Sequence, residues 1–237
     1  MNLIAKLGVI YEHPALLKTI GKKLNRNFVK NLLILKDKFD YTPNTIIDVG
    51  TAVGEWSKAA NFVYPNAKIY AFEPISSSLD KAKNMLQNIS NITYFNLALY
   101  SANQKKKFYI NEFSFSSSLL KMTDRHKEIY PFTKNETEIN VACKRFDSIK
   151  EIILKSPVFV KIDVQGTELE VLKGFGKLIN KVDIIQIELN FEKYYEKQFN
   201  YNEIFAFFSE NKFKRFLQLS PMYYKNNLIA CDYLFLK

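Results

Sequence analysis

The sequence predicts an α/β fold in which helices cover both faces of a mainly parallel sheet. Three observations lead to this prediction. Stretches that suit buried strands alternate with amphipathic helical patterns from residue 45 to residue 189. Glycine or polar residues stand directly after several of these strands, and two more apolar stretches close the chain. Connections of this strand-helix-strand kind are right-handed and leave consecutive strands parallel.

The composition is that of a globular protein. The chain has 237 residues, of which 47% are hydrophobic and 15% are aromatic, enough for a substantial core. No apolar run approaches the roughly 20 residues that span a bilayer, and the N-terminus lacks the pattern of a secretory signal. Cys143 and Cys231 lie far apart, as expected of buried thiols in a reducing compartment. We therefore expect a cytoplasmic protein.

Residues 1–42 are expected to form a helical segment ahead of a single compact unit at residues 43–237. Apolar residues recur at steps of three and four and predict helix over about residues 14–38, in one piece or two, before Pro43 and Asn44 break it. Residues 1–38 hold eight basic and two acidic residues, a charge of +6 within a total of +10. This segment could contact an anionic surface or form the solvated side of a helix.

The elements that follow are expected in this order. Strands are predicted at residues 45–49, 68–72 and 92–99, with helices at 54–63 and 76–89 between them, the second opened by Ser77 with Asp80. Residues 106–110 and 139–146 predict further strands around a polar segment, 111–138, whose lack of period is typical of a lid or binding loop. A strand at 157–164 then leads to a helix from Thr167 to about Asn180, with Thr167 and Glu170 as a capping box.

The last part predicts a strand at residues 182–189, a helix at 201–211 and an antiparallel pair of strands at 213–219 and 228–236. Ligands of such sheets bind at the carboxyl ends of strands, near the point where the strand order reverses. The candidate residues are therefore those that directly follow strands: Asp48, Gly50, Glu73, Asn96, Asp163, Gly166, Glu188 and Asn190.

Gly50 and Gly54 bracket the turn after the first of these strands. Glycine permits positive φ and lets a ligand approach the backbone, so that a side chain at Gly50 would intrude on it. The spacing D-x-G-x-x-x-G differs from the G-x-G-x-x-G of dinucleotide enzymes, and a turn without any ligand is the alternative. Glu73, in "YAFEP", suits a carboxylate that accepts hydrogen bonds from ribose hydroxyls. Together they indicate an adenosine-containing ligand, either NAD or S-adenosylmethionine.

A set of sequence blocks separates these two ligands. The blocks "IIDVGTAVGEWS", "YAFEP", "NLALYS", "RFDSI", "VKIDVQGTELEVLKG" and "IIQIEL" occur in this order from residue 45 to about residue 190. In this combination the chain resembles the FkbM family of S-adenosylmethionine-dependent methyltransferases. It departs from the family at two places. Thr51-Ala52-Val53 stands where many members have Ala-Asn, and Gln165 stands where many have Glu.

The resemblance implies a class I methyltransferase (Rossmann-like) fold with a seven-stranded sheet that ends in an antiparallel hairpin. It implies S-adenosyl-L-methionine as cofactor, with Asp48, Gly50 and Gly54 around its methionine part, Glu73 at the ribose, and Asn96 and Ala98 at the adenine. We add Thr51, Pro74 and Asp163 to the cofactor-binding set. Family members whose substrates are understood mostly methylate hydroxyls, often on sugars or natural products.

Three acidic or basic side chains are candidates for the chemistry. The sulfonium already makes the methyl group electrophilic, so the protein chiefly aligns an acceptor oxygen and removes its proton. Asp163 is the first candidate and Glu188 the second, because both end central strands. These two with Asn190 could offer oxygen atoms to a divalent metal, although no metal is expected. His126, in the polar segment, is either a general base or an exposed loop histidine.

The expected function is therefore methyl transfer to a hydroxyl of a sugar in a polysaccharide, glycolipid or nucleotide-linked saccharide. Three alternatives remain: a methyltransferase acting on RNA or another natural product, a non-catalytic binding module, and an NAD(P)-dependent oxidoreductase. The absent G-x-G-x-x-G motif counts against the oxidoreductase, and no RNA-module pattern is present. The acceptor and the oligomeric state stay open.

Overall fold

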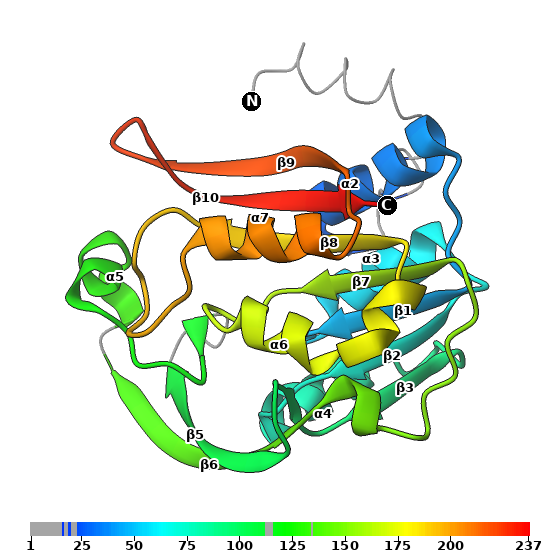
Figure 1. The fold of residues 1–237 in the computed structure, drawn as a ribbon. Helices are drawn as coiled ribbons and strands as arrows, with labels where there is room; N and C mark the ends of the chain where they lie inside the picture. Colours follow the sequence, from blue (N-terminus) through cyan, green and yellow to red (C-terminus); the bar gives the residue numbers. More distant parts are fainter. Residues whose placement is uncertain (1–15, 17–18, 20–22, 112–115, 134) are drawn as a thin grey trace.

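A computed structural model describes residues 16, 19, 23–111, 116–133 and 135–237. It contains a seven-stranded sheet in the order β3-β2-β1-β7-β8-β10-β9 and a three-stranded sheet in the order β4-β6-β5 (Figure 1). Strands β3, β2, β1, β7 and β8 run parallel, while β10 is antiparallel to both β8 and β9. This confirms the predicted α/β fold with its closing hairpin.

The large sheet consists of β1 (Thr45–Val49), β2 (Lys68–Phe72), β3 (Ile92–Phe95), β7 (Val158–Ile162), β8 (Ile184–Asn190), β9 (Arg215–Tyr224) and β10 (Asn227–Leu236). The small sheet consists of β4 (Ala98–Leu99), β5 (Gln104–Asn111) and β6 (Glu136–Lys144). The described α-helices are α2 (Arg26–Phe39), α3 (Glu55–Val63), α4 (Ser76–Met85), α5 (Asp124–Ile129), α6 (Glu168–Gly174) and α7 (Tyr201–Glu210).

The core lies on both faces of the large sheet. Every residue of β1 and β7 is buried, as expected of central parallel strands covered by helices on both sides. One apolar cluster joins α2 and α3 to one face through Leu32, Leu35 and Trp56, and includes Phe159 of β7. The other joins α6 and α7 through Leu172 and Phe208. Helix α2 thus shares a core with the sheet.

One predicted strand is divided between the two sheets. Residues 92–99 were expected to be one strand, but they form β3 and β4, which belong to different sheets. The chain leaves the large sheet at Asn96, whose Nδ2 donates hydrogen bonds to the carbonyl oxygens of Glu73 and Pro74 instead of continuing the ladder. The strands predicted at 106–110 and 139–146 exist, and they pair as β5 and β6 in the small sheet. The segment 111–138 is not irregular throughout, since it contains α5 and the start of β6.

Both predicted helix caps are wrong, because other side chains satisfy the backbone there. Helix α4 follows Ile75 without a side-chain cap, and Glu73 Oε1 accepts the hydrogen bond from Ile75 N. Helix α6 likewise lacks a side-chain cap, and Glu168 Oε1 accepts from Gly166 N. These helices also end earlier than predicted, at Met85 and Gly174, and a 3-10 turn over 176–181 follows the second.

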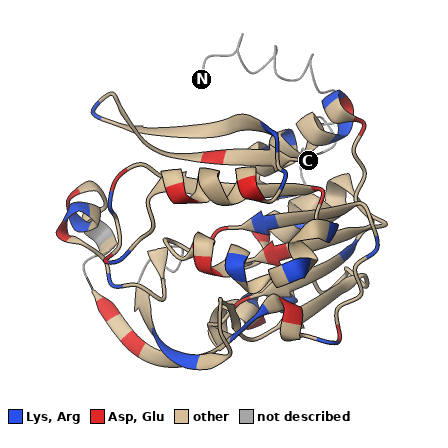
Figure 2. Cartoon of the chain, viewed as in Figure 1, with Lys and Arg blue, Asp and Glu red and all other residues tan. Residues whose placement is uncertain are grey.

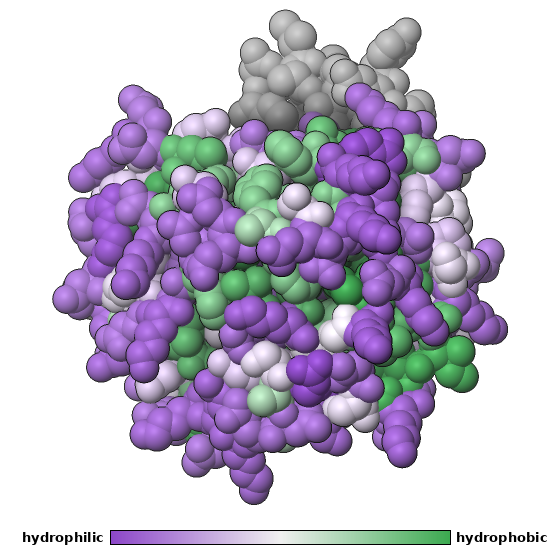
Figure 3. All heavy atoms as spheres, in the orientation of Figure 1, coloured by the Kyte–Doolittle hydropathy of each residue, from purple (hydrophilic) through white to green (hydrophobic). Residues whose placement is uncertain are grey.

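The N-terminal helix pattern is only partly covered by the described residues. Helix α2 begins after Asn25, whose side chain accepts from Asn27 N, and residues 14–25 lie mostly outside the described part. Among the described residues, Lys and Arg are distributed over helices and both sheets (Figure 2). Polar side chains cover most of the viewed face, with smaller apolar areas between them (Figure 3). No helix in the described part of the chain combines the length and apolar character needed to cross a membrane.

Candidate active site

The site lies where the strand order reverses, between β1 and β7. The chain runs from β1 outward to β2 and β3, and later returns to β7 on the other side of β1. The two strand ends are joined by a hydrogen bond of 3.1 Å from Asp163 N to Val49 O. A cavity with about 600 Å³ of empty space, part of it open to solvent, adjoins them; its lining includes Gly50, Ala52, Glu73, Pro74, Ala98, Phe108, Leu119, Asp163, Gln165 and Thr167.

The two glycines of the first turn are required by close packing of the chain itself. Gly50 has φ +77° and Gly54 has φ +89°, in the region that favours glycine. A Cβ atom at Gly50 would overlap the carbonyl oxygen of Asp163, and one at Gly54 would lie 2.9 Å from Leu86 Cδ1. The expectation that a side chain at Gly50 would intrude on a ligand thus misses the nearer obstacle, the end of β7. Gly50 lines the cavity, whereas Gly54 caps α3.

Asp48 and Thr51 stabilise this turn from the side away from the cavity, and neither is among the residues that line the cavity. Asp48 is fully buried, and its Oδ2 accepts hydrogen bonds from Thr51 Oγ1 at 2.7 Å and from Ser57 Oγ at 2.6 Å. Such a charge needs partners when it leaves water. These bonds fix the turn against the start of α3.

Lys161 joins the turn after β1 to the end of β7 and was not among the predicted site residues. Its Nζ donates to Gly50 O at 2.9 Å and lies 3.5 Å from both Asp48 Oδ1 and Asp163 Oδ2. Burial alone would lower the pKa of Lys161, but the carboxylates of Asp163 and Asp48 outweigh it and raise that pKa. The signal was available: a lysine inside the apolar strand "VFVKIDV" has to be paired.

Glu73 connects the first turn to the start of α4. Its Oε2 accepts from Ala52 N at 3.0 Å and its Oε1 from Ile75 N at 2.9 Å, and it lines the cavity. Burial raises the pKa of Glu73 to about 7, although both amide hydrogen bonds and Lys161 favour the charged form. Each carboxylate oxygen keeps a second acceptor position for a ligand.

The region after β3 forms the apolar end of the cavity. Asn96 is exposed and holds the turn at Glu73 and Pro74 with its side chain, and it is not among the lining residues. Pro74 and Ala98 do line the cavity. Further apolar walls that were not predicted come from the small sheet and the chain next to it: Leu97, Leu99, Phe108 and Leu119. These side chains come together because the chain leaves the large sheet after β3 and forms the separate small sheet.

The opposite end of the cavity is acidic. The Asp163 side chain is 40% exposed, and Gln165 Nε2 donates to Asp163 Oδ1 at 2.7 Å and to Glu188 Oε2 at 3.1 Å. Burial, then the charges of Asp163 and Asp232, raise the pKa of Glu188 well above its usual value. Burial also raises the pKa of Asp232, which faces Glu188 across β8 and β10, to about 7.

The candidate metal ligands Asp163, Glu188 and Asn190 do not surround a common point. The Gln165 amide stands between Asp163 and Glu188, and an N–H group is a donor that a cation does not bind. Within the described ranges, no group of three or more His, Cys, Asp or Glu side chains is arranged to hold a metal ion. No contact of Asn190 with these acids supports a metal role for it.

His126 lies in α5 and is buried, at 2% exposure, so the expectation of an exposed loop histidine is wrong. Its Nδ1 lies 3.2 Å from Thr133 Oγ1, and its ring packs among Tyr130, Tyr194 and Tyr195. Burial lowers the pKa of His126 to about 4. His126 is not among the residues lining the cavity.

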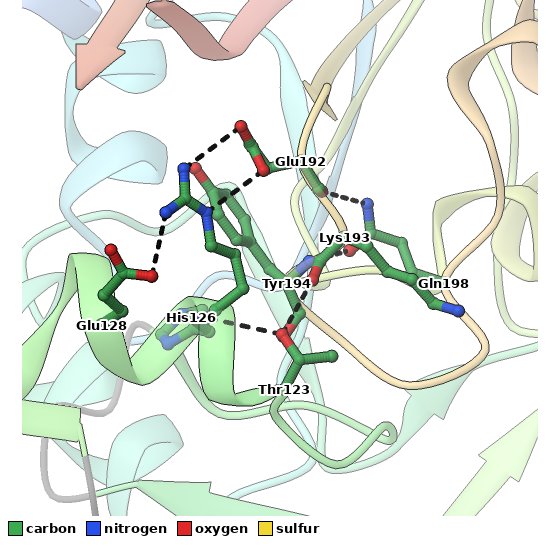
Figure 4. A network of polar contacts seen from close by, with 8 residues as sticks. Thr123, His126, Glu128, Glu192, Lys193, Tyr194 and Gln198 are labelled. Carbon is green, nitrogen blue, oxygen red and sulfur yellow. Dashed lines mark hydrogen bonds and ion pairs between the residues drawn. The ribbon is translucent and has the colours of Figure 1, made fainter. Parts of the chain in front are cut away.

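Helix α5 is fastened to the segment that follows β8 (Figure 4). The hydroxyl proton of Thr123 is shared between the carbonyl oxygens of Lys193 at 2.7 Å and Tyr194 at 3.0 Å, and Arg125 pairs with Glu128 and Glu192. Tyr195, from the same segment, places its hydroxyl 3.0 Å from Gln165 Oε1. The segment after β8 therefore connects α5 with the acidic end of the cavity.

The sheet has the strand order of the class I S-adenosylmethionine-dependent methyltransferases. As in that class, a glycine turn after β1 and an acid after β2 border one cavity. The cavity suits that cofactor: a carboxylate with free acceptor positions, a turn of bare backbone and an apolar end adjoin a single space. The chain belongs to the family described as "Methyltransferase FkbM domain", whose sequence pattern matches residues 48–215. It is a methyltransferase, and its cofactor is S-adenosylmethionine.

Relatives and one solved structure agree with this assignment. The chain is 24% identical over 161 residues to "2-O-methyltransferase NoeI" of Sinorhizobium fredii (strain NBRC 101917 / NGR234), covering 65% of this chain and 66% of that protein. It is 27% identical over 213 residues to "Methyltransferase 1" of Beauveria bassiana (strain ARSEF 2860), covering 80% and 83%. The N-terminal domain of EvdMO1, solved in the presence of SAH and D-fucose, shares the fold, with TM-score 0.50, 8% identity and coverage of 90% and 83%.

Proposed function

We propose that this methyltransferase transfers its methyl group to a hydroxyl of a saccharide. The observation that carries the proposal is the acidic end of the cavity, where Asp163 presents a partly exposed carboxylate beside the glycine turn after β1. The relative named as a 2-O-methyltransferase supports oxygen as the attacking atom, and the structure solved with D-fucose supports a sugar.

The cofactor would be held by both turns at the strand ends. Glu73 would accept hydrogen bonds from the ribose hydroxyls, and the backbone of Gly50 and Ala52 would contact the amino-acid part. The apolar walls around Ala98 and Phe108, which line the cavity, would hold the adenine ring. Asp48, Thr51, Gly54 and Asn96 support these groups from outside the cavity. When bound, the cofactor supplies an electrophilic methyl group.

Asp163 would orient the acceptor and take its proton. A sugar hydroxyl is a poor nucleophile until its proton is accepted, and a carboxylate within hydrogen-bond reach serves as the base. Gln165 donates to Oδ1, and we assign the acceptor to Oδ2, the oxygen on the side of Lys161. Lys161, 3.5 Å from Oδ2, keeps a positive charge beside this carboxylate. Glu188 stands one hydrogen bond further away, behind Gln165.

The test has two stages. Calorimetry with S-adenosylhomocysteine first measures cofactor binding, with NADP as the comparison. The protein is then incubated with S-adenosylmethionine carrying a tritiated methyl group and a panel of methyl glycosides that includes methyl fucoside, and with a short RNA. Transfer to a glycoside, located on one oxygen by mass spectrometry, is expected. Transfer to RNA alone, or to no member of the panel by a protein that binds the cofactor product, contradicts the saccharide proposal.

A further inference from the structure

Gln165 uses every polar atom of its side chain at the acidic end of the cavity. Its Nε2 donates to Asp163 Oδ1 at 2.7 Å and to Glu188 Oε2 at 3.1 Å, and its Oε1 lies 3.0 Å from Tyr195 Oη. An amide nitrogen has two protons, so the two carboxylates take both. Rotating the amide by 180° would turn Oε1 toward two carboxylates. The surroundings therefore fix the direction of this amide.

The backbone of Gln165 is held as firmly as its side chain. Its φ of +59° is unusual for a residue other than glycine, and such strain persists only where neighbours enforce it. Ser118 Oγ donates to Gln165 O at 2.6 Å, which ties the residue to the segment after β5. Tyr195 is fully buried, and its hydroxyl also lies 3.1 Å from Ser116 O. The segment after β5 and the segment after β8 thus both fix the position of Gln165.

We propose that Gln165 is the positioning residue of the acceptor site: its amide, anchored by Glu188 and Tyr195, holds the Asp163 carboxylate so that Oδ2 faces the acceptor hydroxyl. The role of Asp163 rests on the proposed function, while the hydrogen-bond network is independent of it. Gln165 and Asp163 both line the cavity, so a change at Gln165 would act directly at the place where the acceptor is proposed to bind. A shift of about 1 Å in such a group can cost about 100-fold in rate.

The amide also explains why this chain has Gln where many family members have Glu. The charges of Asp163, Asp232 and Glu168 already act on Glu188 here, while Lys161 interacts with Asp163 and Asp232. A carboxylate at residue 165 would add repulsion with two acids at hydrogen-bond distance. A protonated glutamic acid has one proton and could satisfy only one of them. The amide bridges both at any pH.

The bridge itself is tested by NMR spectroscopy on the full chain with S-adenosylhomocysteine. The side-chain amide signal of Gln165 is assigned by its loss in Gln165→Asn. We expect both of its protons to be shifted and protected from exchange relative to those of the exposed Gln104, and the carboxyl carbon signal of Asp163 to move in the variant. An amide signal like that of Gln104, or an unchanged Asp163 signal, overturns the inference even if no acceptor is known.

Kinetics with the methyl glycoside that the wild type methylates test the consequence. Gln165→Asn keeps an amide and a residue type that tolerates positive φ, but is one methylene too short to reach both acids. We expect its kcat/KM for the glycoside to fall about 10- to 100-fold, with the Kd for S-adenosylhomocysteine within about 2-fold of the wild type. Gln165→Glu should lose more activity at pH 8 than at pH 6, a pH dependence that a purely structural role would not produce. Gln104→Glu is the matched control and should behave as the wild type.

The outcomes separate the two proposals. If the wild type binds S-adenosylhomocysteine but methylates no glycoside, the saccharide proposal fails. The NMR signals of the Gln165 amide and the Asp163 carboxyl group then decide by themselves whether Gln165 holds Asp163 in place. If the bridge is present and Gln165→Asn transfers methyl groups at the wild-type rate, the positioning role is wrong while the proposed function stands.

Discussion

The two ends of the cavity are built from different kinds of contact. At the cofactor end, by which we mean the part of the cavity around Gly50 and Glu73 proposed to hold the cofactor, backbone groups hold the polar atoms. Glu73 accepts from two main-chain amides, and Gly50 fits against the main chain of Asp163. At the acidic end, side chains hold side chains, as Gln165 holds Asp163 and Glu188. A site built on backbone can be changed only by disturbing the fold, whereas one built on side chains can change its chemistry with the fold intact.

The largest expected effect comes from Gly50→Ala, which tests whether the cofactor end depends on the fold. The new Cβ would overlap Asp163 O at a residue with φ +77°, so β1 and β7 would have to separate. We expect the free energy of unfolding in urea to fall by about 2–4 kcal/mol. Ala52→Gly in the same turn is the control: Ala52 has φ +48°, so glycine there should leave stability unchanged or raise it slightly. Equal stability of Gly50→Ala and wild type would refute the packing argument.

The difference between the two ends also explains what the sequence could predict. Residues in one local pattern were identifiable, because "DVGTAVG", "YAFEP" and "KIDVQG" each contain their own turn chemistry. The central strands were equally clear from their apolar runs. The small sheet was not, because the break at Asn96 depends on hydrogen bonds to Glu73 and Pro74, 22 and 23 residues away. The contact of Gln165 with Tyr195, 30 residues away, leaves no local signal either.

Glu73→Gln should have the second largest effect. It tests the cofactor end with a side chain of nearly the same size as that of glutamate. A glutamine has one acceptor oxygen, so one of the amides of Ala52 and Ile75 would face an NH₂ group instead. We expect the Kd for S-adenosylhomocysteine, measured by calorimetry, to rise at least about 10-fold, which corresponds to about 1.4 kcal/mol. Glu210→Gln, at an exposed position of α7, is the control. Unchanged binding in Glu73→Gln would remove Glu73 from the cofactor site.

The acidic end should make the free energy of unfolding depend on pH. Burial raises the pKa of Asp232 to about 7 from a model-peptide value near 4, so the folded protein binds a proton there that the unfolded chain has released. This contribution to stability is complete below the unfolded pKa and is lost as the pH rises through about 7. We expect the stability of the wild type relative to Asp232→Asn to fall by about 1–2 kcal/mol between pH 5 and pH 7.5 in urea titrations. A difference that rises with pH would show that Asp232 is charged in the fold.

The smallest effect is expected from His126→Gln, which asks whether α5 belongs to the chemistry or only to the scaffold. Burial lowers the pKa of His126 to about 4, so the ring is neutral at neutral pH, and it packs among tyrosines away from the cavity lining. A general base contributes about 100- to 10,000-fold to a rate, whereas a packing residue acts mainly on stability. We expect methyl transfer at pH 7.5 to stay within about 3-fold of the wild type, while the melting temperature falls because the packing of the ring against Tyr130, Tyr194 and Tyr195 is lost. A loss above about 100-fold with unchanged melting would make His126 the base. It would also mean that α5 moves toward the cavity when the acceptor binds, because the segment after β8 already links α5 to Gln165.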